Sequence, residues 1–503
     1  MKTFVVITSL FISALSLYAQ DIHINSSNKE LEKSFEWAKT KARSFVVTGQ
    51  TGPVNRSEQD KPYTTEAYQP AYWAGYPLRT AFYSRDFCHQ ISGAHLLGLE
   101  TENYTMMKSF AASANISRKW YPLWAINFDG TPFNLDYHGD DNFVREVPAT
   151  FELVEKAYKL YCWTADKRYL DDQVLWNYYT KAVTDFITLH DSKIPNGIAE
   201  GTGEGNIFKG TATFNEQADT PLIEAGDGIA TQYAAFTAFA QMAQLRGDKQ
   251  LSKEFSKKAQ SLKKYFNSDW GIKGTATYNR GYSTEKKAVS GWGKENSWFM
   301  PMKGIVDETS ERTEKYLDFI SDRLDSKDDI PDNIEAISYV PEVFFQYSRN
   351  EEGWKWMKHI LTTINDSHAA GNLTGKNGNY PEVSYVLISN TIENLAGVEP
   401  KAFENKVSTA SHLPKDIEML EVKNIRMGKS LFSIQHNGLE SSTLKYESGK
   451  SPLKWEASFI GSHKYLLVNG TKQKGKQIKK YGITYTVCQL NLEPGEQIKI
   501  SIK

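Results

Sequence analysis

Side chains that can bind a sugar and transfer protons follow a cluster of aromatic residues near position 80. Trp73 belongs to the aromatic stretch, and Arg85, Asp86 and His89 open an apolar helical pattern shortly after it. Asp86 and His89 are three residues apart, so on a helix they share one face. A guanidinium can bind a carboxylate in bidentate fashion, and aromatic rings pack on sugars through their apolar faces. The stretch favours a sugar pocket at the mouth of a buried helix. The alternative is a structural Arg85–Asp86 ion pair between helices.

Carboxyl groups in or beside long loops could supply the acid and base of a hydrolytic reaction. Cleavage of a glycosidic bond uses one carboxylic acid to protonate the leaving oxygen and a second carboxylate to activate water or attack the sugar. Glu216 lies in a loop rich in Gly and Thr, Glu224 precedes a helix start, and Glu382 follows a Gly/Asn loop and a proline. A helix N-terminus stabilises a carboxylate, although simple helix capping explains such positions equally well. The predicted catalytic residues are Glu216, Glu224, Glu382 and Asp86.

Aromatic, amide and basic side chains in the same loops are the candidates for holding a substrate. Asp140 and Asp141 lack the spacing of a calcium loop, and one histidine is too few for zinc. We therefore expect no metal and no cofactor. Several cations near the proposed pocket favour a uronic acid as the sugar: Arg79, Arg85, Arg118, Lys119 and Arg145. The predicted substrate-binding residues are Trp73, Arg85, His89, Trp124, Tyr137, His138, Asn215, Trp292 and Trp298.

The first twenty residues are typical of an export signal. An apolar run over 4–17 follows Lys2 and ends before small and polar residues, which predicts a signal peptide over 1–20 and a periplasmic location. A membrane anchor is the alternative, and no other segment is apolar enough to insert into a membrane. The net charge of −1 gives no indication of nucleic-acid binding, and the three cysteines lack metal or disulfide spacing.

Hydrophobic periodicity divides the rest of the chain into two parts. Over 21–400 apolar residues recur at helical spacing, and long loops alternate with short turns, as helical hairpins arranged in a ring would require. Over 415–503 short alternating runs separated by turn residues predict a small antiparallel, β-sandwich-like domain. The expected helices cover 28–45, 80–98, 102–117, 147–165, 168–189, 225–246, 250–267, 309–325, 333–348, 351–366 and 383–397.

Four segments of the helical part resemble a known superfamily. Residues 80–90, 145–172, 212–236 and 379–400 look like those of the six-hairpin (α/α)6-toroid glycoside hydrolases, and in particular like exported glycan-degrading enzymes of Bacteroidetes type. The resemblance implies a mainly α fold, an (α/α)6 toroid with a small C-terminal antiparallel β domain. It also implies a glycoside hydrolase that acts on an oligosaccharide or polysaccharide.

The specific activity stays open at this level. We expect an exo-acting enzyme that removes a terminal sugar, with a β-glucuronidase-like activity first and an α-L-rhamnosidase-like activity second. A polysaccharide lyase that uses Tyr137 or His138 as its base is an alternative. A glycan-binding protein without catalysis is another, although the carboxyl candidates argue against it. The oligomeric state is not predicted.

Overall fold

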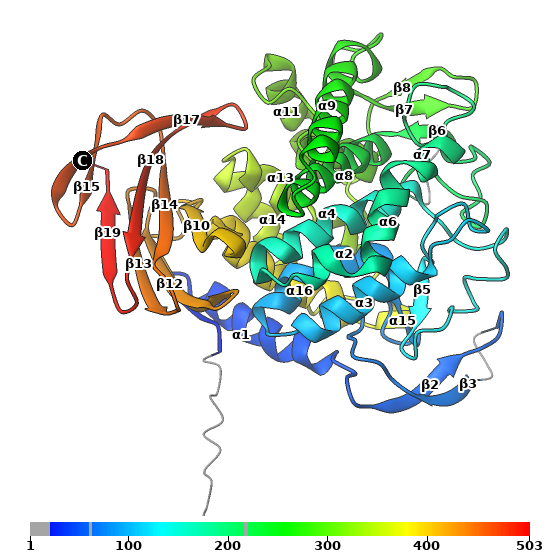
Figure 1. The fold of residues 1–503 in the computed structure, drawn as a ribbon, viewed down its shortest axis with the longest axis horizontal. Helices are drawn as coiled ribbons and strands as arrows, with labels where there is room; N and C mark the ends of the chain where they lie inside the picture. Colours follow the sequence, from blue (N-terminus) through cyan, green and yellow to red (C-terminus); the bar gives the residue numbers. More distant parts are fainter. Residues whose placement is uncertain (1–20, 60–62, 216–219, 503) are drawn as a thin grey trace, which may run out of the picture.

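The computed structural model describes residues 21–59, 63–215 and 220–502, so the predicted signal peptide lies outside the described residues. A large helical region packs beside a β region that contains most of the chain after residue 398 (Figure 1). None of the described helices combines the length and apolar composition needed to cross a membrane.

Most of the helices agree with the predicted ones, but the expected helix over 168–189 is three helices, the short α15 was not expected, and two further differences have a clear cause. α10 was not expected, because its eight residues are too few to show a helical period. The expected helix over 333–348 is two helices, since Pro341 in the first turn of α13 cannot continue the preceding one. The helices are α1 (Lys29–Ser44), α2 (Ser84–Leu96), α3 (Glu100–Ser113), α4 (Val147–Thr164), α5 (Arg168–Asp171), α6 (Gln173–Val183), α7 (Asp185–Leu189), α8 (Gly226–Leu245), α9 (Lys249–Tyr265), α10 (Glu295–Met302), α11 (Glu311–Asp325), α12 (Ile334–Ser338), α13 (Val340–Gln346), α14 (Asn350–Thr363), α15 (Gly371–Thr374) and α16 (Pro381–Ser389).

Six helical segments form a closed circuit of neighbours, with α12 and α13 together counted as one segment. α2 packs on α4, α4 on α8, α8 on α10 and α10 on α13; α12 precedes α13 in the chain and packs on α16, which returns to α2. In α8 fifteen of twenty residues are buried, as expected for a helix surrounded by others. α9 buries only Phe255, Ala259 and Leu262 and packs on the outside of α8. The circuit therefore forms an inner layer, covered by an outer one.

A buried ionic cluster ties two members of the inner layer together. The Nζ of Lys303, just after α10, lies 2.7 Å from Glu152 Oε1 and 2.6 Å from Glu155 Oε2, both on α4. Lys156 lies 3.7 Å from the same Glu152 oxygen. Removing one partner of such a cluster leaves an uncompensated buried charge, which costs about 3–5 kcal/mol. The cluster fixes the C-terminal end of α10 against α4.

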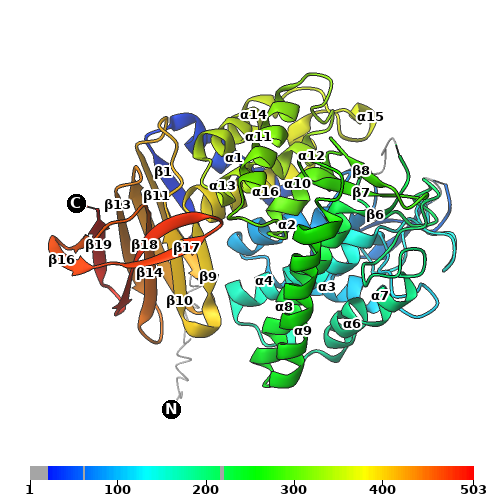
Figure 2. The ribbon, with the colours of Figure 1, turned by 90° about the horizontal axis from the view of Figure 1, so that it is seen from above.

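Short sheets in the long connections gather on the side remote from the C-terminal β region (Figures 1 and 2). Two of their strands lead directly into inner helices: β4 into α2 and β6 into α8. This side therefore carries the N-terminal ends of inner helices. The strands are β2 (Thr51–Asn55), β3 (Tyr63–Ala67), β4 (Ala81–Tyr83), β5 (Ala125–Asn127), β6 (Leu222–Ala225), β7 (Asn279–Ser283) and β8 (Ala288–Ser290).

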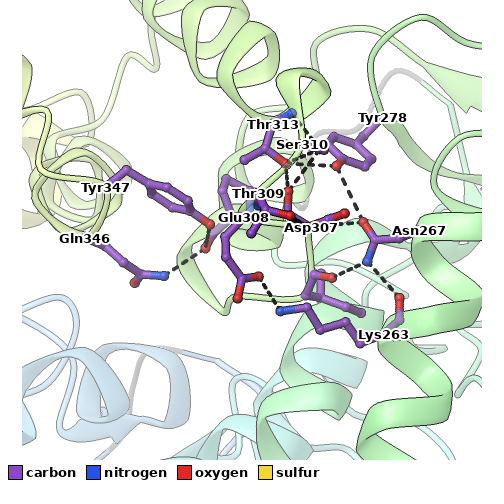
Figure 3. Close-up of polar contacts among 12 residues, drawn as sticks. Lys263, Asn267, Tyr278, Asp307, Glu308, Thr309, Ser310, Thr313, Gln346 and Tyr347 are labelled. Carbon is purple, nitrogen blue, oxygen red and sulfur yellow. Dashed lines mark hydrogen bonds and ion pairs between the residues drawn. The ribbon is translucent and has the colours of Figure 1, made fainter. Parts of the chain in front are cut away.

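The connection from α10 to α11 is tied to α9 by side-chain hydrogen bonds (Figure 3). The amide of Asn267 donates to the carbonyls of Lys263 and Ile305 at 2.7 and 2.8 Å, and its Oδ1 accepts the backbone N–H of Asp307 at 2.8 Å. Lys263 and Glu308 form an ion pair of 2.6 Å. These contacts anchor the end of α10 that is opposite to Glu295.

The β region consists of two sheets with the orders β1-β11-β12-β13-β19-β15-β16 and β17-β18-β14-β10-β9. The expectation of an antiparallel domain is corrected at one pair, since β10 and β14 run parallel. The strand β1, at the start of the described chain, also joins the first sheet. The strands are β1 (His23–Ser26), β9 (Val398–Lys401), β10 (Lys406–Ala410), β11 (Met419–Met427), β12 (Ser430–Asn437), β13 (Ser441–Ser448), β14 (Leu453–Ile460), β15 (Tyr465–Val468), β16 (Thr471–Lys474), β17 (Lys476–Lys480), β18 (Ile483–Leu492) and β19 (Gln497–Ser501).

Candidate active site

A cavity of about 310 Å³ opens where α2, α10 and α12 begin. A ligand pocket typically combines an apolar or aromatic wall with a few convergent polar groups, and this cavity has both. It is lined by Tyr76, Arg85, Phe214, Asn215, Lys294, Glu295, Asp332, Asn333, Glu335, His368, Ala369 and Ala370.

Acidic residues mark the N-terminal ends of the inner helices. One stands in the first turn of α2, α8, α10, α12 and α16, and one is the residue before α4. All are buried. The positive end of each helix dipole stabilises a carboxylate there, whereas burial opposes its charge. Two of these six acidic residues, Glu295 and Glu335, line the cavity. The six residues are Asp86, Glu146, Asp227, Glu295, Glu335 and Glu382.

Glu335 is held by a histidine of fixed tautomer. His368 Nε2 lies 2.9 Å from Glu335 Oε2, and the backbone N–H of Ala370 donates to His368 Nδ1 at 2.8 Å. Because Nδ1 accepts a hydrogen bond, the ring proton sits on Nε2 and is donated to the carboxylate. Glu335 therefore faces the cavity as an oriented hydrogen-bond acceptor.

Glu295 lies near a second carboxyl group, that of Asp227. Asp227 Oδ2 accepts the Thr213 hydroxyl at 2.8 Å and the Phe214 N–H at 2.7 Å. The pKa of Asp227 is raised to about 7, chiefly by burial and also by the charge of Glu295, while these two hydrogen bonds oppose the rise. Asp227 therefore holds its proton at pH values below about 7.

Arg85 is the cation that α2 presents to the cavity. Its guanidinium donates to the carbonyl of Phe214 at 3.0 Å and lies over the ring of the same residue at 5.6 Å. The next residue, Asp86, accepts a hydrogen bond from the hydroxyl of Tyr380. Burial raises the pKa of Asp86, and the charge of Arg85 opposes that rise. Of these two neighbouring residues, Arg85 therefore lines the cavity, whereas Asp86 bonds to Tyr380 in the protein interior.

Glu382 belongs to a buried network behind the cavity. It contacts His89 Nδ1, and the Ser338 hydroxyl lies 3.3 Å from its Oε1. His89 stacks on Tyr339 at 3.6 Å. Burial raises the pKa of Glu382, as does the charge of Asp86, and burial lowers the pKa of His89. Both directions favour a neutral pair with one proton between the carboxyl group and the ring.

An aromatic wall closes one side of the cavity. His368 stacks parallel to Tyr380 at 5.4 Å, and Tyr76 meets the edges of both rings. Tyr76 and His368 line the cavity directly. Such a wall offers the flat apolar surface against which a sugar ring packs.

The structure brings some of the predicted residues together and separates others. Arg85 and Asn215 line the cavity, while Asp86, His89 and Glu382 lie in the network behind it. Glu224, which the sequence predicted as catalytic, is not among the described residues that line the cavity. Its carboxylate accepts hydrogen bonds from Asn196 and Trp270, its burial raises its pKa to about 7, and the acidic residues near it are Glu200 and Asp191. Glu216 lies outside the described residues.

The predicted aromatic binders pack elsewhere. Trp298 is fully buried, Trp292 packs against it at 5.7 Å, and Trp73 packs on Phe128 at 4.7 Å. The indole of Trp124 donates to Glu146 at 2.9 Å. None of the four is among the described residues that line the cavity.

The loop pair Tyr137 and His138 is also absent from the cavity lining within the described chain. The hydroxyl of Tyr137 donates a hydrogen bond to Asp140 at 2.6 Å, and the ring of His138 packs at a tilt against that of Phe208, with 5.0 Å between the ring centres. Within the described ranges, no three His, Cys, Asp or Glu side chains gather as a metal site would require.

Three functional candidates were missed from the sequence: Glu295, Glu335 and His368. Both glutamates stand at helix starts, where capping is an adequate explanation of an acidic residue, and His368 lies in a loop. The signal that could have found them is the repetition of an acidic residue at successive inner-helix starts.

Comparison with known proteins supports the fold. No family model matches the chain, and no curated protein matches it. Among solved structures, the chain is similar to an α-L-rhamnosidase from Dictyoglumus thermophilum, with a TM-score of 0.60 and 13% identity over 96% of this chain and 50% of that one. An α-L-rhamnosidase from Aspergillus terreus gives 0.53 and 11% over 95% and 50%. A putative kojibiose phosphorylase from the human microbiome gives 0.53 and 9% over 94% and 64%. The chain spans about half the length of the two rhamnosidases.

Proposed function

We propose that this protein is a glycoside hydrolase that removes one terminal sugar from a glycan. The observation that carries the proposal is the cavity in which Glu295 and Glu335 stand at the starts of neighbouring inner helices. Glycoside hydrolysis needs two carboxyl groups at one site. At about 310 Å³ the cavity is at the small end of the range of about 300–1,000 Å³ for ligand pockets, which favours the end of a glycan chain over its middle.

The two carboxyl groups have different surroundings, and this difference suggests their roles. Glu335 accepts a hydrogen bond from His368 Nε2 and is thereby oriented as the base that activates water. Glu295 is the other carboxyl group at a helix start in the lining, so we assign it the role of the acid that protonates the leaving oxygen. Arg85 and the Tyr76 wall would hold the sugar between them.

The cleaved sugar is proposed to be neutral, with a deoxy sugar first. Of the five cations expected at the pocket only Arg85 lines the cavity. Arg79 lies 3.9 Å from Asp136, and Arg118 pairs with Asp140 at 2.7 Å. The cavity lining carries Arg85 and Lys294 against Glu295, Asp332 and Glu335, a balance that does not favour a uronate carboxylate. A uronic acid is therefore the second candidate for the cleaved sugar. The rhamnosidases that share the fold cleave a deoxy sugar, which is an analogy of fold.

We also propose that the closed circuit of helices is the inner ring of an (α/α)6 toroid. The toroid would be the first of two domains of the protein, over 21–400, and the β domain over 415–503 would be the second. A further proposal is that residues 1–20 direct export to the periplasm. The circuit of contacts supports the first point. Sequencing the N-terminus of protein recovered from the native periplasm tests the last. An intact N-terminus would contradict it.

A panel of aryl glycosides tests the proposed function. We expect release of the aryl group from one neutral glycoside, most readily a rhamnoside, and slower or no release from glucuronides. The reaction is run with and without inorganic phosphate, because a phosphorylase would require it. A uronate polymer is included, and a gain in ultraviolet absorbance without aryl release would identify a lyase instead. No release from any glycoside would contradict the proposal.

A further inference from the structure

A second hollow, of about 170 Å³, lies between the loop that precedes α4 and the loop that connects α7 to β6. Its lining includes four cations and one carboxylate: Lys119, Arg145, Lys193, Lys209 and Glu200. The only histidine of the lining, His190, has its pKa lowered to about 4, chiefly by burial and also by the charges of Lys119 and Arg145. The hollow is therefore strongly positive.

The four cations have no acidic partner of their own. Within the described parts of the chain none of them forms an ion pair, and Lys193 and Arg145 donate only to backbone carbonyls. The one carboxylate in the lining is already occupied, since Glu200 accepts the backbone N–H groups of Ser192, Lys193 and Ile194. Asp141 and Glu204 act on Arg145 only at longer range. The charges are available to an anion.

The hollow lies close to the catalytic cavity. Thr202 lines the hollow and donates to the carbonyl of Gly210 at 3.0 Å, while Phe214 lines the cavity. Gly210 and Phe214 are four residues apart, which a chain can span by at most about 14 Å. Arg145 immediately precedes Glu146, the acidic residue at the start of α4. One oligosaccharide could therefore reach both places.

We propose that this hollow binds an anionic group, a sulfate ester or a carboxylate, on the part of the glycan that remains after cleavage. This inference rests on the proposed function for the order of the two sugars, with the neutral sugar in the cavity and the acidic unit beyond it. Planar or tetrahedral oxyanions suit the donors of Arg145 and the point charges of three lysines. The substrate class is an acidic glycan ending in a neutral sugar.

Calorimetric titration of the full-length Glu335→Gln variant tests the site without turnover. The probes are cellobiose, glucosyl-β-1,4-glucuronate, and cellobiose sulfated at C6 of its reducing glucose. We expect at least one anionic probe to bind about tenfold or more tightly than cellobiose, and the preference to weaken as salt is raised. The two anionic probes distinguish the carboxylate from the sulfate ester.

A double substitution, Lys193→Gln with Lys209→Gln, identifies where the preference arises. It should bring the affinity ratio of the anionic probe to cellobiose close to one. The matched control is Lys253→Gln with Lys257→Gln on the exposed side of α9, which removes the same charge and should keep the ratio. Equal affinity for all probes, or an equal fall of the affinity ratio in both double variants, would overturn the proposed anion site. An absence of turnover on the aryl panel would overturn the proposed function alone, because the titration needs no turnover.

Discussion

His368 connects the Glu335 carboxylate to the backbone of the loop that contains His368 itself. His368 Nε2 lies 2.9 Å from the carboxylate, and His368 Nδ1 accepts the backbone N–H of Ala370 at 2.8 Å. We predict that His368→Ala lowers kcat about 10- to 100-fold with little change in KM, because losing a buried hydrogen bond of about 1–3 kcal/mol leaves the base misoriented. His368→Gln, which can still donate to the carboxylate, should recover part of kcat. Steady-state kinetics of both variants test this. A change confined to KM would contradict a positioning role.

Glu295→Gln should impair turnover in proportion to the need for protonation of the leaving group. An aryl glycoside whose phenol has a low pKa should lose little activity, whereas an alkyl glycoside should lose about 10²- to 10⁴-fold. Rates over a series of leaving groups measure this directly. A loss that is the same for every leaving group would remove Glu295 from the role of acid.

Asp227→Asn should change how stability depends on pH. The pKa of Asp227 is raised from 3.8 to about 7 in the folded state, so the folded protein binds the extra proton and its stability falls as pH rises through this window. The asparagine variant lacks this loss, and it should gain on the wild type between pH 4 and 7 by up to about 4 kcal/mol. Denaturant unfolding at several pH values tests the sign. Asp318→Asn, at an exposed position on α11, is the control.

Substitutions of Glu382 distinguish the catalytic role predicted from the sequence from a structural role in the buried network with His89. Glu382→Gln should keep most of the turnover, because the amide can still bond His89. Glu382→Ala should lower the free energy of unfolding by about 2–5 kcal/mol, since it leaves a cavity and an unpaired ring. Melting temperature and kcat are measured together. If the glutamine variant is inactive at an unchanged melting temperature, Glu382 is catalytic as the sequence predicted.

Long, strongly periodic helices such as α8 and α9 could be predicted from the sequence because their apolar spacing extends over several turns. α10 could not, since its eight residues contain an internal proline and are all buried, which leaves no alternation of apolar and polar residues to detect. The strand β1 was missed because its pairing with β11 joins residues about 400 positions apart. No local pattern reports such a contact.

The site could be predicted only in part, for a related reason. Arg85 and Asp86 stood out because aromatic residues precede them, and Asn215 because it lies in a long loop. Glu335, in the first turn of α12, and His368, in a loop, are 33 residues apart and meet only in the folded chain. The sequence could not show that the tryptophans lie outside the cavity lining, because a large aromatic side chain packs in a core as readily as in a pocket, as the buried Trp298 does here.

The measurement that tests the central claim most directly is the turnover of Glu335→Gln on the aryl glycoside that the wild type cleaves fastest. The account predicts a fall in kcat of about 10²- to 10⁴-fold. It also predicts a melting temperature close to that of the wild type, because the amide can still accept the bond from His368. Wild-type turnover by this variant would contradict the assignment of Glu335 as the base and, with it, the cavity as the active site.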